Sequence, residues 1–134
     1  MRNKRNAVAG AAAVAAGIAI FSCGFALGQS RNAFGMPHTV LHIVELQWKP
    51  DTPDATKQEI INGLRDEARK IPGIKNIWLK AGRVQPRDFS TAFAIEFRSR
   101  DAADNYAESE IHQAWSDNYQ KYRQASISIQ VTNP

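Results

Sequence analysis

The stretch TVLHIVELQWK, residues 39–49, decides the fold, because apolar side chains recur in it at every second position, as is typical of a β-strand. One face of this strand carries His42, Val44, Leu46 and Trp48. The other face carries Leu41, Ile43, Glu45 and Gln47. Since the strand begins apolar on both faces, we expect it to lie inside a sheet that is covered on both sides.

A helix follows this strand, because Pro50 interrupts the alternation and Thr52 is suited to cap a helix whose first residue is Pro53. Pro72 and Gly73 end this helix. Its expected buried stripe consists of Ile60, Ile61, Leu64, Ala68 and Ile71. The charged side chains expected to point to water are Lys57, Arg65, Glu67 and Lys70. The pattern indicates a helix that lies on a sheet.

Three further strands are expected at residues 74–79, 92–97 and 125–132. In the strand at 92–97, the small residues Ala92 and Ala94 alternate with large apolar ones, and we expect the small residues to accept a packed helix. In the last strand, we expect one buried side made of Ile127, Ile129 and Val131.

A second helical region lies between the last two strands. Ser99 is suited to cap its start, and the pair Ser109-Glu110 interrupts it. After the interruption, the expected buried stripe is formed by Ile111, Trp115, Tyr119 and Tyr122. The region is therefore expected to consist of two shorter helical pieces.

The order strand, helix, strand, strand, helix, strand predicts a ferredoxin-like βαββαβ domain of the α+β class, with both helical regions on one face of an antiparallel sheet. We place this domain at residues 38–132, after a linker at residues 29–37. The other face of the sheet would expose large apolar side chains to water. We therefore expect a homodimer in which two sheets pack face to face as a dimeric α/β barrel.

The first 28 residues read as a signal peptide or an N-terminal membrane anchor, because a basic start is followed by an uncharged apolar run from Ala7 to Gly28. Small residues at Ala26 and Gly28 suit cleavage before residue 29. The run is also long enough to cross a bilayer, which needs about 20 apolar residues. A third reading places a lipid on Cys23. All three readings predict an exported, periplasmic or extracytoplasmic domain.

The charge balance excludes nucleic acid as the main partner. Removing the leader's three cations from the 17 Lys and Arg leaves 14, against 13 Asp and Glu, without a clustered basic stripe. We expect contact with a membrane only through the N-terminal segment. Cys23 is the only cysteine, so the domain can form no internal disulfide, and its stability must come from burial.

Three segments resemble the stress-responsive dimeric α/β-barrel (Dabb) family. They are the strand at residues 40–49, the helix exit at residues 71–75, and the tract from residues 96–99 to Tyr106 and His112. A plant polyketide cyclase of this architecture uses a tyrosine and a histidine six positions apart, and Tyr106 and His112 match them. The resemblance also implies that His42 lines a cavity. Two departures are Thr91, where the cyclase has a further histidine, and Ser109-Glu110, where the family commonly has His-Pro.

Tyr106 and His112 are the candidate catalytic residues, because an imidazole can accept a proton near neutral pH while a phenol polarises a carbonyl or fixes the tautomer of the ring. Six positions is not a helical neighbour spacing, so the two side chains meet only if the interruption at Ser109-Glu110 bends the chain. The alternative is structural: Tyr106 packs with its hydroxyl at the rim, and His112 bonds a backbone carbonyl.

The candidate ligand-binding residues are His42, Trp48, Trp115 and Tyr119. Aromatic side chains of this kind line apolar pockets, although a buried helix face is the simpler interpretation. No spacing of histidines, carboxylates or cysteines forms a metal site, and no phosphate loop or hydrolase nucleophile motif is present. We therefore expect no cofactor and no metal.

The sequence leaves several functions open. The first is an exported homodimer that binds a small apolar or aromatic molecule. The second is a cyclase or lyase with His112 as base and Tyr106 as orienting acid. A haem-binding monooxygenase-like barrel, with His112 as ligand, and a purely structural stress protein are further alternatives.

Overall fold

The computed structural model describes residues 34–134, of which residues 36–134 form one compact unit. The elements in chain order are β1 (Val40–Trp48), α2 (Asp54–Lys70), β2 (Ile74–Trp78), β3 (Thr91–Phe97), α3 (Arg100–Glu108), α4 (Glu110–Gln120) and β4 (Arg123–Val131). The expected leader at residues 1–28 lies outside the described residues. Among residues 34–134, the structure contains no helix with the length and apolar character that a bilayer crossing requires.

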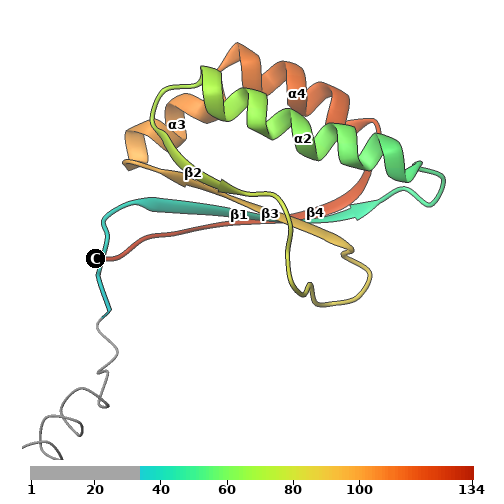
Figure 1. The fold of residues 1–134 in the computed structure, drawn as a ribbon, viewed down its shortest axis with the longest axis horizontal. Helices are drawn as coiled ribbons and strands as arrows, with labels where there is room; N and C mark the ends of the chain where they lie inside the picture. Colours follow the sequence, from blue (N-terminus) through green and yellow to red (C-terminus); the bar gives the residue numbers. More distant parts are fainter. Residues whose placement is uncertain (1–33) are drawn as a thin grey trace, which may run out of the picture. The chain divides into compact units, whose positions relative to one another are not determined.

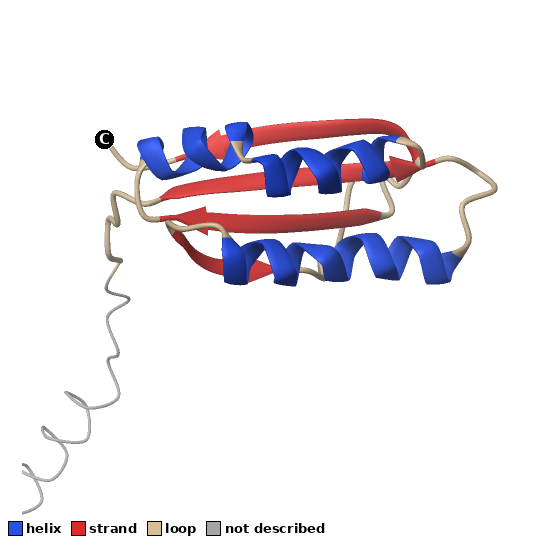
Figure 2. Ribbon diagram, turned by 90° about the horizontal axis from the view of Figure 1, so that it is seen from above, coloured by secondary structure: helices blue, strands red, loops and turns tan. Residues whose placement is uncertain are grey.

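The four strands form one antiparallel sheet in the order β2-β3-β1-β4. β1 lies in the centre, so that Val44 faces Phe93 on β3 and Ser128 on β4. All three helices cover the same face of this sheet (Figures 1 and 2). The predicted ferredoxin-like order of elements is confirmed, with the second helical region divided in two as the interruption at Ser109-Glu110 indicated.

The core lies between the sheet and the helices. β1 contributes Val44, Leu46 and Trp48, of which Leu46 is completely buried. β3 contributes Phe93, Ile95 and Phe97. The expectation that the small residues of β3 accept the helices is therefore wrong, because Ala92 and Ala94 lie on the opposite face. Large apolar side chains fill the space under a helix layer better than alanines do, and each buried large side chain contributes about 1.5–3 kcal/mol.

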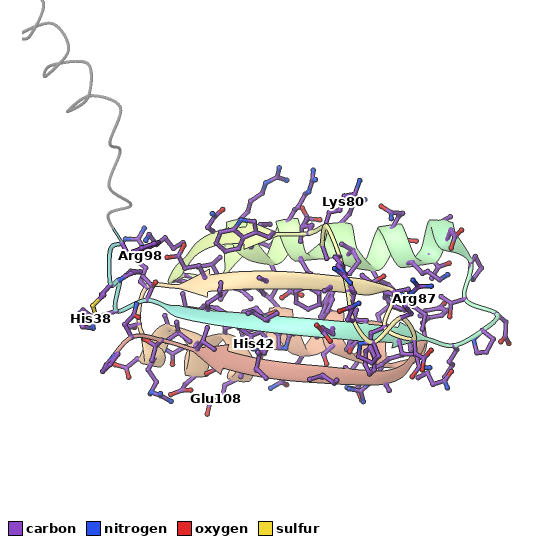
Figure 3. All side chains as sticks on the ribbon, turned by 90° about the horizontal axis from the view of Figure 1, so that it is seen from below. His38, His42, Lys80, Arg87, Arg98 and Glu108 are labelled. Atoms are coloured by element: carbon purple, nitrogen blue, oxygen red, sulfur yellow. The ribbon has the colours of Figure 1, made fainter. Side chains whose placement is uncertain are left out.

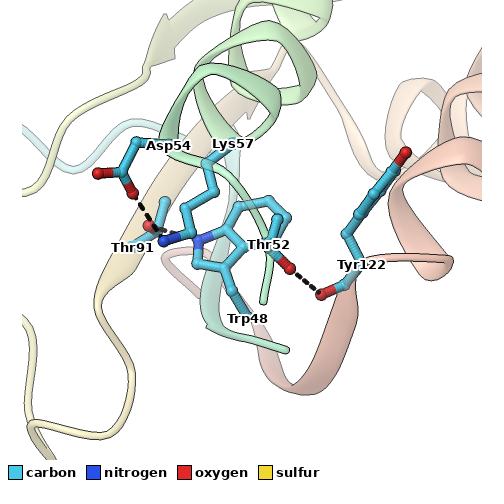
Figure 4. A network of polar contacts seen from close by, with 6 residues as sticks. All are labelled: Trp48, Thr52, Asp54, Lys57, Thr91 and Tyr122. Carbon is cyan, nitrogen blue, oxygen red and sulfur yellow. Dashed lines mark hydrogen bonds and ion pairs between the residues drawn. The ribbon is translucent and has the colours of Figure 1, made fainter. Parts of the chain in front are cut away.

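The two predicted helix caps have different outcomes. The Ser99 hydroxyl accepts a hydrogen bond from the amide of Ala102 at 3.2 Å, which confirms it as the cap of α3. Thr52 does not cap α2, whose N-cap is Pro53 without a side-chain hydrogen bond. The Thr52 hydroxyl instead donates to the carbonyl of Tyr122 at 3.5 Å and ties the start of α2 to the turn after α4 (Figure 4).

The second face of the sheet is open (Figure 3). Ile127, Ile129 and Val131 on β4 lie on this face and are 45%, 50% and 47% exposed, and Trp78 on β2 is 46% exposed. The expected burial of these three β4 side chains is therefore wrong within a single chain. Their pairing with β1 places Ile129 beside Ile43, so the open face is apolar across neighbouring strands.

Candidate functional site

The break between α3 and α4 brings Tyr106 and His112 together. Ser109 is in an extended conformation and serves both as the last cap of α3 and the first cap of α4. Its amide donates to the carbonyl of Tyr106 at 3.1 Å, and its carbonyl accepts from the amide of Gln113 at 2.9 Å. The rings of Tyr106 and His112 lie 4.0 Å apart between centroids, at 37°. The condition for the two side chains to meet, a bend of the chain at Ser109, is fulfilled.

A third residue, Glu67 on α2, completes the cluster. Its Oε2 lies 3.1 Å from Nδ1 of His112, and the residue is only 2% exposed. The expectation that Glu67 points to water is wrong. Buried positions on α2 follow the spacing Ile60, Leu64, Glu67 and Ile71, with Glu67 in the place expected for Ala68. The three-and-four spacing was the signal that could have identified it.

The contact with Glu67 replaces the backbone hydrogen bond that a purely structural His112 was expected to make. We assign the proton of the neutral imidazole to Nδ1, because Nδ1 faces the carboxylate and an ionised carboxylate can only accept. This tautomer leaves Nε2 with a free lone pair. The side chain of His112 is 20% exposed, whereas that of Glu67 is 3% exposed. The imidazole is therefore the accessible member of the pair.

Burial also controls the protonation of the neighbouring groups. Burial raises the pKa of Tyr106 far above its ordinary value, and the nearby Glu67 carboxylate raises it further. The phenol therefore keeps its proton near neutral pH and can donate a hydrogen bond. Burial lowers the pKa of His42, and the adjacent His112 adds to this effect. His42 thus belongs to the same layer as the cluster, as its position on the inner face of β1 requires.

Two buried polar atoms of this layer have no hydrogen-bond partner among the described residues. They are Oε1 of Glu67 and Nδ1 of His42. An unpaired buried polar atom costs about 1–3 kcal/mol. The layer is therefore costlier for the fold than an apolar core would be.

The predicted ligand-binding aromatics pack against one another next to His112. Trp115 stacks between His112 at 5.7 Å and Tyr119 at 5.0 Å, and Trp48 meets the edge of Tyr119 at 6.3 Å. The indole of Trp48 donates to the Thr91 hydroxyl at 2.8 Å (Figure 4). The helix stripe therefore contains His112, and the expected place of Ile111 in it is wrong, because Ile111 is 40% exposed.

The surface around the cluster has a few shallow hollows. None of the five that we describe for residues 34–134 is lined by Tyr106, His112 or Glu67. One of them is a groove of about 750 Å³ between α2 and α4, and its lining includes Trp115, three residues after His112. Gly63 and Asn62 of α2 and Asn118 of α4 also line it. Within the same residues, no group of three or more histidines, cysteines or carboxylates could hold a metal ion.

A four-stranded antiparallel sheet with this strand order and helices on one face defines the ferredoxin-like class of α+β domains. The family model described as the stress responsive A/B barrel domain, or Dabb, matches residues 40–133. The chain belongs to this family. No curated protein matches the chain significantly by sequence.

Solved structures with the same fold include proteins with and without a known activity. A dimeric protein of unknown function from Bacteroides fragilis is 20% identical, with a TM-score of 0.59 over 73% of this chain and 99% of that one. Hydroxynitrile lyase from Passiflora edulis is 17% identical, with a TM-score of 0.62 over 71% and 93%. A cofactor-independent oxygenase from Streptomyces nogalater is 12% identical, with a TM-score of 0.60 over 72% and 94%. These likenesses show the shared fold.

Proposed function

We propose that this protein is an exported homodimer that binds a small apolar or aromatic carbonyl compound and transfers a proton on it. The base is Nε2 of His112, and the phenol of Tyr106 is the acid that orients the substrate oxygen. Glu67 holds the imidazole. The observation that carries the proposal is the 3.1 Å contact between His112 and the buried carboxylate of Glu67.

The cost of this arrangement favours chemistry over packing. A buried carboxylate is destabilising unless it is paired, and an apolar residue of similar volume commonly gives equal or higher stability. Glu67 occupies a position on the inner stripe of α2 that apolar residues fill elsewhere. Titratable groups whose surroundings shift their protonation cluster at functional sites. Tyr106 and His42, both beside this pair, have such shifts.

The proposed reaction needs only the side chains of this cluster. His112 removes a proton from the carbon next to a carbonyl, or from a hydroxyl, and becomes an imidazolium that Glu67 stabilises. The phenol donates a hydrogen bond to the oxygen on which negative charge develops. The proton then returns to the product, so the cluster ends as it began. Cyclisation and lyase reactions of the aldol type share this step.

The homodimer is supported by the open face of the sheet. Its apolar side chains span β4 and the edge strand β2, at about half exposure, and a second copy could cover them. A two-fold arrangement would place the same face of each copy against the other, as a self-complementary apolar surface requires. Export is supported by the sequence of residues 1–28.

Hydrogen–deuterium exchange of small ketones tests the proposed chemistry. Wild-type protein in D₂O should speed the exchange of protons next to the carbonyl, followed by NMR, and His112→Ala should remove this acceleration. His38→Ala is the matched control, because His38 lies exposed in the segment before β1. Equal exchange rates in wild type and His112→Ala across a panel of aliphatic and aromatic ketones would refute the proposed role of His112.

Native mass spectrometry tests the binding and the assembly separately. The exported protein should be observed as a dimer, with added mass if a ligand co-purifies. Its monomer mass also reveals whether residues 1–28 are removed. A monomer at micromolar concentration would contradict the homodimer without bearing on His112.

A further inference from the structure

The groove between α2 and α4 has one aromatic side chain in its lining, that of Trp115. The same indole is stacked on the imidazole of His112, with 5.7 Å between ring centroids and 26° between planes. One side chain therefore separates the groove from the base of the proposed reaction. Most of the other lining residues are polar, among them Gln58, Asn62 and Asn118.

The indole of Trp115 is held by one hydrogen bond and by close packing against the backbone of Gly63. Its Nε1 donates to the backbone carbonyl of Ile60 at 2.8 Å. Gly63, one turn further along α2, leaves the space in which the ring lies. A Cβ atom at Gly63 would meet Cδ1 of Trp115 at 2.9 Å and Nε1 at 3.1 Å. Glycine in the interior of a helix is less stable than alanine, so its presence there needs a packing reason. The indole supplies this reason.

The packing of the cluster limits its contact with solvent to the 20% of the His112 side chain that is exposed. Tyr106 is 5% exposed and Glu67 is 2% exposed. The imidazole of His112 packs against the rings of both Tyr106 and Trp115. Trp115 lines the 750 Å³ groove, and its ring also stacks on His112.

We propose that the groove between α2 and α4 is the entrance to the His112 centre, and that Trp115, resting on Gly63, is the side chain that closes it. This inference rests on the proposed function, because an entrance matters only if His112 acts on a substrate. It adds the chemical class of that substrate. A planar, aromatic or conjugated molecule can take the place of the indole between His112 and Tyr119, because it restores both stacking contacts. The polar groups of the groove suit a substrate with a polar end.

Carbethoxylation of histidine by diethyl pyrocarbonate measures this access without any substrate. The full-length protein is treated at fixed pH, and the tryptic peptide 101–121, in which His112 is the only histidine, is quantified by mass spectrometry. Trp115→Phe keeps a ring but removes the donor to Ile60. Gly63→Ala adds a methyl group that displaces the indole from its position against α2. Both should raise the modification rate of His112 by about fivefold, the bias that one hydrogen bond of ordinary net strength gives.

Gly82→Ala is the matched control, because a Cβ atom at Gly82 meets nothing within 4 Å. It should leave the rate unchanged. Amide hydrogen exchange of β3 reports whether a substitution destabilises the whole domain. Its rate should stay at the wild-type level in both test variants. An unchanged His112 rate in Trp115→Phe would overturn the proposal, as would a raised rate that accompanies faster exchange throughout β3. If the protein does not accelerate ketone proton exchange but the modification rates of His112 rise in both variants, the proposed entrance is supported and the proposed reaction is refuted.

Discussion

The two faces of the sheet are built from the same strands, yet only one of them is complete in a single chain. On the covered face, Leu46 and Phe97 are fully buried under the helices. On the open face, Ile129 of the neighbouring β4 remains 50% exposed. Strand alternation makes both faces apolar, and the helices of this chain cover only one of them. Within residues 34–134 no element covers the open face, and the proposed homodimer would supply this cover.

The two faces also differ in their polar groups. The layer under the helices includes Glu67, Tyr106 and His112, where His112 contacts the other two, and His42 on the inner face of β1. On the open face, an ion pair lies near the edge of the sheet, where Lys75 donates to Glu96 at 2.9 Å. A pair exposed to solvent adds little stability. The costly polar groups therefore lie where the helices can enclose them, which is the arrangement that chemistry requires.

The largest expected effect comes from Phe97→Ala on the covered face. Because Phe97 is completely buried, its truncation should lower the free energy of unfolding by about 3–5 kcal/mol. Ile127→Ala on the open face is the comparison, and should cost about 1 kcal/mol. Urea denaturation measures both. Equal losses for the two variants would mean that the faces do not differ within one chain.

The second effect concerns the open face alone. Ile129→Lys should raise the dissociation constant of the proposed dimer at least about a hundredfold, because two charges would be buried between the sheets without partners. Gln120→Lys, at an exposed position of α4, is the control. Sedimentation equilibrium of the full-length protein distinguishes them. A dimer that tolerates the Ile129→Lys substitution would place the contact between copies elsewhere.

The third effect separates stability from function on the covered face. Glu67→Gln removes the buried charge but keeps the shape, so the free energy of unfolding should change by less than about 1 kcal/mol or rise. The rate of ketone proton exchange should fall roughly tenfold to a hundredfold, since the imidazolium loses its stabilising partner. Glu108→Gln, at an exposed position of α3, should alter neither quantity. If Glu67→Gln retains the full exchange rate, the carboxylate is only structural.

The smallest effect is a pH dependence from His42. Its pKa in the folded protein is lowered from 6.5, so the unfolded chain takes up a proton at higher pH than the folded one. Stability from this residue is therefore present above pH 6.5 and is lost as the pH falls from 6.5 through the folded-state pKa. His42→Gln should reduce this slope in denaturation experiments, and His38→Gln should not. An identical slope in His42→Gln would assign the acid sensitivity to other groups.

The fold could be predicted from local patterns, but the assignment of faces could not. Alternation located β1 and β3, and the serine before Arg100 marked the start of α3. Alternation alone does not say which of two apolar faces receives the helices, so the outward position of Ala92 and Ala94 was missed. Helical spacing likewise allowed Ala68 or Glu67 on the inner stripe of α2, and only packing against α4 decides between them.

The sequence by itself determined the order of the elements and the break at Ser109, because each depends on residues close together in the chain. The structure decided that this break bends the chain so that Tyr106 meets His112. Only the tertiary structure decided that Glu67 meets His112, 45 positions away, and that Trp115 rests on Gly63. Such contacts form when two helices pack side by side on one sheet. Which residues meet across the two helices depends on how closely the helix layer and the sheet pack together. The local periodicity of the sequence does not contain this information.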